Sequence, residues 1–158
     1  MAPLFSTHAD PALESLLPET VSGHSMHRYS LTLTQVLEDS DDRAGITAFL
    51  QTLGKTEADG SFASAFDPTN MVGGGINAFK VAGADAALLL AGITAIELSD
   101  LGTDATSEPA TVGGKNVTVV SIGDGVNQTI WIYGHGDVVF VVHATDATNA
   151  RAYLEALP

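Results

Sequence analysis

The spacing of apolar residues along the chain predicts both strands and helices. Residues 25–33 (SMHRYSLTL) alternate between two sets of side chains, which predicts a strand. Further on, apolar side chains recur at the i, i+3, i+4, i+7 spacing of one helical face: Ile46, Phe49, Leu50 and Leu53. This helix is expected to begin at a capping residue among positions 39–41 and to end at Gly54.

More strands are predicted in the rest of the chain. Residues 61–66 and 76–81 have strand character and are joined by a loop rich in Pro, Asn and Gly. Residues 101–108 are polar and predict a connector. Two hairpins should follow, one over residues 110–122 with a Gly-Gly turn and one over residues 129–144 with a His-Gly turn.

Helices are also predicted near both ends of the chain. Asp10-Pro11 places a capping residue before a Pro at the first helical position, and residues 145–157 carry an apolar helical face. We therefore predict an α+β fold in one domain over residues 10–158, preceded by a loose tail over residues 1–9. The antiparallel sheet should have about six to eight strands, with three to four helices packed mainly on one face.

The segment 85–98 is the most apolar part of the chain and predicts a helix that is covered on more than one side. Over residues 86–96 the single polar side chain is Thr94. Leu88 and Leu89 are adjacent, so they lie about 100° apart on a helix and cannot both face the sheet. They are candidate interface residues. In a monomer, a neighbouring helix would cover the leucine that does not face the sheet, and we favour this arrangement. The alternative is that a second copy of the chain covers it.

Two short patterns occur twice and indicate an internal pseudo-repeat. The pattern P-x-T-V-x-G begins at Pro18 and again at Pro109. The pattern F-x-V, followed by Asp-Ala, begins at Phe79 and again at Phe140. If the repeat is real, each half contains a hairpin, two strands and a helix. Chance matching among common residues is the alternative.

The charge of the chain narrows the classes of partner. The net charge is −13, with 19 Asp and Glu against six Lys and Arg. Binding to nucleic acid or to an anionic membrane surface needs clustered cations, and the six here are scattered: Arg28, Arg43, Lys55, Lys80, Lys115 and Arg151.

The longest apolar run is shorter than the roughly 20 residues of a membrane span, so we expect no direct membrane insertion. Residues 1–9 have no signal-peptide pattern, and we expect the sequence to begin just upstream of the first structured element.

No residue pattern for a metal, a cofactor or catalysis is found. The chain has no Cys, which excludes disulfides and thiolate ligands. Neither the His residues nor the Asp cluster at 39–42 has the spacing of a zinc or calcium ligand set. The acidic residues lie in predicted turns and caps rather than on facing strands. We therefore predict no catalytic residue, no metal ligand and no cofactor.

One pair of aromatic side chains is a candidate ligand platform. Trp131 and Tyr133 alternate on one face of a predicted strand and can stack on a sugar or peptide; core filling is the interpretation we favour. Close to them, His135 belongs to the sequence GHGD, which predicts a structural turn with a positive φ at Gly136.

Three segments resemble a group of bacterial domains. They are the opening DPALESLLPETVSG, the run GHGDVVFVVHATD and the closing ARAYLEALP. Together they resemble exported domains of unassigned function that follow lipoprotein or Ser/Thr-rich linker segments in Gram-positive and related bacteria. The resemblance implies an extracytoplasmic location, on the cell envelope or secreted, and carries over no catalytic or binding residue.

These observations predict a non-catalytic extracytoplasmic binding or interaction domain of a bacterial envelope protein. Its partner would be an unknown protein or envelope component, and a monomer is favoured over a homodimer. The alternative is a small-molecule carrier or small enzyme with a pocket between sheet and helices. A cavity lined by titratable groups would favour the alternative, whereas a filled core with an external apolar patch would favour the first interpretation.

Overall fold

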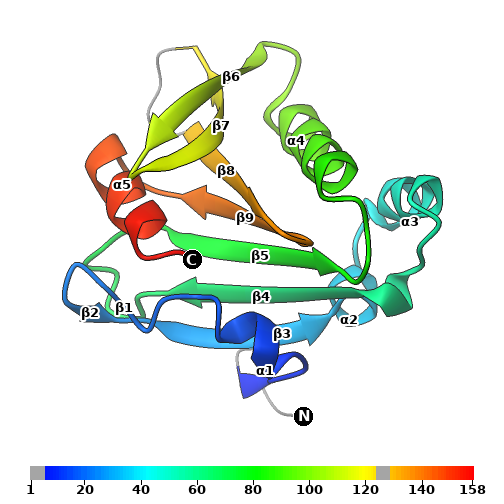
Figure 1. The fold of residues 1–158 in the computed structure, drawn as a ribbon, viewed down its shortest axis with the longest axis horizontal. Helices are drawn as coiled ribbons and strands as arrows, with labels where there is room; N and C mark the ends of the chain where they lie inside the picture. Colours follow the sequence, from blue (N-terminus) through cyan, green and yellow to red (C-terminus); the bar gives the residue numbers. More distant parts are fainter. Residues whose placement is uncertain (1–5, 124–128) are drawn as a thin grey trace.

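The computed structural model describes residues 6–123 and 129–158, which form an α+β fold around one large antiparallel sheet (Figure 1). Within these residues, seven strands form the large sheet in the order β3-β4-β5-β9-β8-β7-β6, and two short strands form a second sheet. The strands are β1 (Thr20–Val21), β2 (His24–Ser25), β3 (His27–Thr32), β4 (Gly60–Phe66), β5 (Gly75–Val81), β6 (Ala105–Val112), β7 (Lys115–Ile122), β8 (Thr129–His135) and β9 (Val138–His143). The predicted fold class and sheet size are confirmed.

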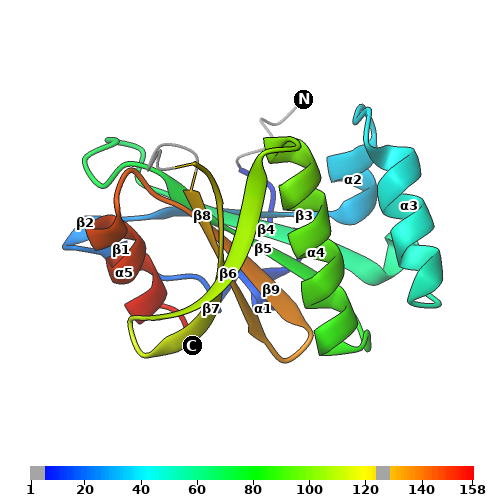
Figure 2. The same ribbon diagram turned by 90° about the horizontal axis from the view of Figure 1, so that it is seen from above.

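Helices cover both faces of the sheet. They are α1 (Pro11–Glu14), α2 (Leu33–Leu37), α3 (Arg43–Thr52), α4 (Ala86–Leu101) and α5 (Ala147–Glu155), with a short 3₁₀ turn, η2 (Glu57–Asp59). The side chains of α2, α3 and α4 belong to one hydrophobic core, and those of α1 and α5 belong to another. Figures 1 and 2 show α3 and α4 together at one side of the sheet and α5 at the other side.

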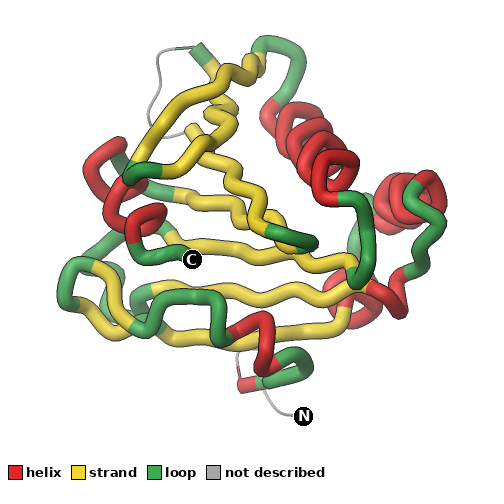
Figure 3. The backbone as a smooth tube through the Cα atoms, in the orientation of Figure 1, coloured by secondary structure: helices red, strands yellow, loops and turns green. Residues whose placement is uncertain are grey.

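The central strand β9 divides the two cores by the alternation of its side chains. Val139 and Val141 pack in the core of α4, whereas Phe140 and Val142 pack in the core of α5. All four are at most 1% exposed. A strand buried on both faces therefore consists of continuous apolar residues, and Figure 3 shows it inside the continuous sheet.

Aspartates begin three of the helices, and the sequence predicted the one at Asp10. Asp10, Asp85 and Asp146 each accept a hydrogen bond from the backbone N–H three residues later. These bonds satisfy N–H groups that have no partner inside the helix. The starts of α1, α4 and α5 are thus set by local chemistry.

Three expected boundaries are wrong. The helix expected to begin at a capping residue among positions 39–41 has Asp42 as its N-cap, which makes no side-chain capping hydrogen bond. The predicted strand 25–33 is interrupted at Met26 and ends at Thr32, where a capping box with Gln35 begins α2. The second half of the predicted polar connector 101–108, residues 105–108, is instead the start of the strand β6, which pairs with β7 along its whole length. An edge strand tolerates polar side chains and a Pro because one of its sides needs no partner strand.

The N-terminal segment runs along the edge of the large sheet. Of the predicted loose tail, residues 1–5 lie outside the described residues. Beyond them, the N–H of Ser30 donates to Thr7 and the N–H of Ala9 donates to the carbonyl of Ser30. Residues 7–9 therefore hydrogen-bond with the outer edge of β3.

The pseudo-repeat is visible in the turns but not in the helix positions. The first P-x-T-V-x-G segment turns at Ser22-Gly23 (φ +50° and +81°) and the second at Gly113-Gly114 (φ +60° and +77°). Both are two-residue hairpin turns with left-handed residues. The helices that follow the second pattern, α4 and α5, lie on opposite faces of the sheet. The two halves thus share local geometry without sharing helix placement.

Candidate functional site

An apolar cavity lies between the sheet and the helices α2, α3 and α4, which Figure 2 shows grouped at one end of the molecule. Its volume is about 200 Å³. The apolar side chains that line it come from all three helices and from β5: Leu33, Val36, Leu37, Ile46, Phe49, Leu50, Phe79, Val81, Leu89, Ile93 and Ile96. An apolar cavity of about 150 Å³ holds a benzene molecule, so this space suits a phenyl or a branched alkyl group.

Two glycines allow the walls of the cavity to approach one another. A Cβ on Gly92 of α4 would lie 2.0 Å from the ring of Phe49, so the missing side chain lets α3 and α4 pack closely. A Cβ on Gly60, at the start of β4, would lie 2.5 Å from Leu33 of α2. The positions of α2 and α3 therefore depend on residues with no side chain.

Six polar residues line the cavity: Ser40, Asp42, Ser61, Lys80, Glu97 and Asp100. The three acidic ones lie at its solvent end. Asp42 precedes α3, while Glu97 and Asp100 lie on the last turns of α4. Asp42 and Asp100 are exposed, whereas Leu37 and Leu89 at the inner end are buried. The cavity therefore has an apolar interior and a carboxylate-lined mouth.

Glu97 has the unusual carboxylate of this group. Burial raises its pKa to about 6, and the neighbouring Asp100 carboxylate adds to the effect. In residues 6–123 and 129–158, no Lys, Arg or His side chain lies within 4.0 Å of Asp42, Glu97 or Asp100 as an ion-pair partner. Arg43, next to Asp42 in sequence, instead forms a two-point ion pair with Glu57 at 2.9 Å and 2.9 Å.

A shallow depression continues from the other side of Glu97. It is lined by Glu97, Asp100 and Leu101 from the end of α4 and by His143 from the end of β9. Burial lowers the pKa of His143, so its neutral form is favoured. Among the described residues, no group of three or more His or acidic side chains is arranged to hold a metal ion.

A Ser–Glu–His cluster on β3 and α1 has catalytic residue types but a structural arrangement. Ser30 Oγ donates to Glu14 Oε1 at 2.5 Å, and His8 Nδ1 lies 2.9 Å from Glu14 Oε2. The carboxylate, not the imidazole, contacts the serine, and Ser30 is fully buried. A serine nucleophile needs a base at its hydroxyl and access to substrate. We interpret this cluster as an attachment of α1 to β3.

The two aromatic candidates lie on the face of β8 that packs against α5. Trp131 is 5% exposed and belongs to the core. Tyr133 is half-buried, stacks on Phe140 and donates its hydroxyl to the carbonyl of Pro158 at 2.9 Å. Lys115 Nζ lies 5.7 Å from the centre of the Tyr133 ring. Trp131 therefore fills the core in this structure, and Tyr133 is held by contacts within the chain.

The two leucine candidates on α4 have different surroundings. Leu89 is fully buried and lines the cavity, whereas Leu88 is 56% exposed.

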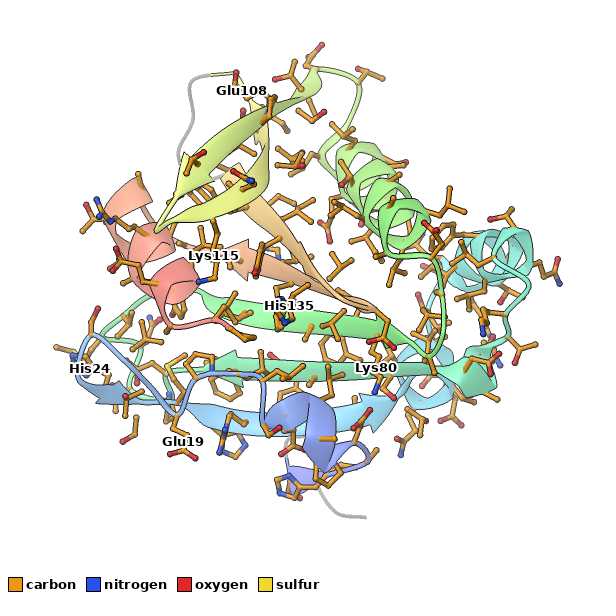
Figure 4. All side chains as sticks on the ribbon, viewed as in Figure 1. Glu19, His24, Lys80, Glu108, Lys115 and His135 are labelled. Atoms are coloured by element: carbon orange, nitrogen blue, oxygen red, sulfur yellow. The ribbon has the colours of Figure 1, made fainter. Side chains whose placement is uncertain are left out.

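The predicted turn of GHGD is also present, with Gly136 at φ +60° between the paired residues His135 and Val138. Figure 4 shows Glu19, Glu108 and His135 on different parts of the fold.

The acidic mouth was not predicted from the sequence. Its only sequence signal is the spacing of Leu89, Ile93, Ile96, Glu97 and Asp100, which share one face of a helix. On that face the residues change from apolar to acidic toward the C-terminus. The signal becomes meaningful only when α2 and α3 are known to enclose the same space.

Comparisons with models of protein families, with curated proteins and with solved structures found no match for this chain. No helix in the described part of the chain is both long and apolar enough to cross a membrane. Functional inference therefore starts from the geometry of the cavity.

Proposed function

We propose that this domain is a non-catalytic small-molecule carrier, the alternative that the sequence left open, and that it takes a small apolar group into the cavity between the sheet and α2, α3 and α4. The observation that supports this proposal is the cavity itself, with about 200 Å³ of space behind an open, acidic mouth. Packed protein interiors leave few voids larger than a water molecule. A space of this size is large enough to bury a small ligand.

The surface offers less support for an interaction through an external apolar patch. Among the described residues, the large apolar side chains that are exposed are Met71 and Leu88. Met71 lies in the loop between β4 and β5, and Leu88 lies in the first turn of α4. Single exposed apolar residues on separate elements are ordinary and do not form a contiguous patch.

Binding also fits the polar lining better than catalysis does. In the described residues, no side chain of the polar lining (Ser40, Asp42, Ser61, Lys80, Glu97 and Asp100) hydrogen-bonds with another side chain of that set. Ser40 Oγ accepts a hydrogen bond from the backbone N–H of Asp42 at 3.2 Å. A nucleophile and its base, or a base and the group that orients it, are normally within hydrogen-bond reach.

The resemblance to exported bacterial domains adds an extracytoplasmic location to the proposal.

A titration of isotope-labelled protein with toluene tests the proposal. We expect saturable chemical-shift changes at the residues that line the cavity, such as Leu37, Leu89 and Ile93. The variant Ile46→Trp, which fills the space, should lose this response. Ala48→Trp places the same side chain on an exposed position of α3 and should keep it. Absence of saturable shifts in the folded wild-type protein would show that the cavity is not a binding site.

A further inference from the structure

We propose that the natural ligand of the cavity is a small amphipathic amine. Its apolar part would occupy the cavity, and its ammonium group would lie at the mouth among the carboxylates of Asp42, Glu97 and Asp100. This inference rests on the proposed function and specifies the chemical class of the ligand.

The first argument is the order of residues along one face of α4. Leu89, Ile93 and Ile96 line the cavity from its inner end, and Glu97 and Asp100 continue the same face at its outer end. These positions are spaced by three or four residues, so their side chains lie one above another. A ligand that follows this face therefore meets apolar side chains first and carboxylates last.

The second argument is that no cation of the described chain faces the mouth. Arg43 is held by Glu57 through two hydrogen bonds. Lys80 borders the cavity through its strand, but its neighbours Phe79 and Val81 point into the core of α4, so its own side chain points to the opposite face. His143 lies on the far side of Glu97, where burial favours its neutral form.

The third argument is that the surroundings of the Glu97 carboxylate disfavour its charged form. Its carboxylate is partly buried and has Asp100 beside it, and both conditions disfavour the charged form. An ammonium group at the mouth would reverse both effects, because it supplies an opposite charge and a hydrogen-bond donor. The site is therefore most complementary to a ligand with one positive charge next to a small apolar group.

Protonation of Glu97 should control this binding. In the free protein the pKa of Glu97 is raised to about 6 by burial and by Asp100. Below that pH the side chain is neutral, and the attraction for an ammonium group is weaker. Affinity for an amine should therefore rise between pH 5 and pH 7.5, whereas affinity for a neutral ligand of the same shape should not rise.

The experiment compares benzylamine, a cation at both pH values, with benzyl alcohol, a neutral probe of nearly the same size. Dissociation constants are measured by NMR titration or calorimetry at pH 7.5 and pH 5. At pH 7.5 we expect benzylamine to bind about tenfold more tightly than benzyl alcohol, the ratio that one charge-assisted hydrogen bond provides. Glu97→Gln should remove most of this preference and its pH dependence.

The matched control is Glu108→Gln on β6, an exposed glutamate that does not line the cavity (Figure 4). Glu108 lines a separate depression between β6 and another face of α4. The variant makes the same change in net charge and should leave the preference intact. Equal affinity for the two probes, or a preference that persists in Glu97→Gln, would overturn the amine proposal while leaving the cavity a binding site. Binding of neither probe would overturn the proposed function and this inference with it.

Discussion

Gly92 determines how closely α4 approaches α3. Its missing Cβ leaves room for the ring of Phe49, which would otherwise be 2.0 Å away. In an exposed helix, glycine is unfavourable by about 1 kcal/mol relative to alanine. The close contact with Phe49 supplies a structural reason for glycine at this position.

The pair Gly92→Ala and Gly45→Ala should change stability in opposite directions. At Gly92 the new methyl group must displace the Phe49 ring, so we expect a loss of about 1–3 kcal/mol. At Gly45, in α3, nothing lies within 4 Å of the added Cβ, and we expect a gain of up to about 1 kcal/mol from helix propensity. Chemical denaturation of both variants measures this. Equal effects at the two sites would contradict the packing that we describe.

One side of the helix α4 packs against the hydrophobic core, and its other side faces solvent. Leu89 and Ile93 face the sheet and the cavity, while Ala87, Leu88 and Ala91 are exposed. The helix is apolar on nearly all sides, yet its exposed side consists mainly of alanine. Small side chains expose little apolar area, which explains how this sequence tolerates contact with water.

Truncation of the two adjacent leucines of α4 should separate its two sides. Leu89→Ala removes a fully buried side chain, and we expect a loss of about 2–5 kcal/mol. Leu88→Ala changes a side chain that is 56% exposed, and the effect should stay within about 0.5 kcal/mol. Thermal and urea unfolding are suitable measurements. A large loss in Leu88→Ala, together with a smaller species in light scattering, would instead indicate that Leu88 contacts a second copy.

At the scale of the whole molecule, the two cores differ in how completely they are filled. The core of α1 and α5 contains large buried side chains such as Phe140, Trp131 and Tyr153. The core of α2, α3 and α4 encloses the cavity and ends at the partly buried carboxylate of Glu97 and the exposed carboxylates of Asp42 and Asp100. The unpaired carboxylate of Glu97 disfavours the folded state when it is charged, so stability should depend on its titration.

Glu97→Gln should stabilise the protein at high pH and have little effect at low pH. The pKa of Glu97 is raised from 4.5 to about 6 in the folded state. A raised carboxyl pKa means that the folded state binds the proton more tightly. The free energy that this tighter proton binding adds to folding is fully present below about pH 4.5. It is lost as the pH rises through about 6. We expect the variant to be more stable by about 1–2 kcal/mol at pH 8 and nearly equal at pH 4. An unchanged difference across this range would contradict the shifted pKa.

The features that the sequence predicted correctly depend on neighbours a few residues away. The cap at Asp10 accepts a hydrogen bond from the N–H group three residues on, and Gly136 adopts a positive φ within its own turn. Such interactions are complete within one segment, so composition and spacing are sufficient to predict them. The alternation of side chains likewise predicted most strands and the antiparallel sheet.

Only the tertiary structure decided how distant segments of the chain lie relative to one another. The sequence did not show that α4 and α5 lie on opposite faces, or which of the adjacent residues Leu88 and Leu89 is exposed. It also did not predict the site, because the cavity exists only where three helices and β5 enclose one space. The raised pKa of Glu97 depends on that enclosure, since desolvation is a property of the surrounding atoms rather than of the residue itself.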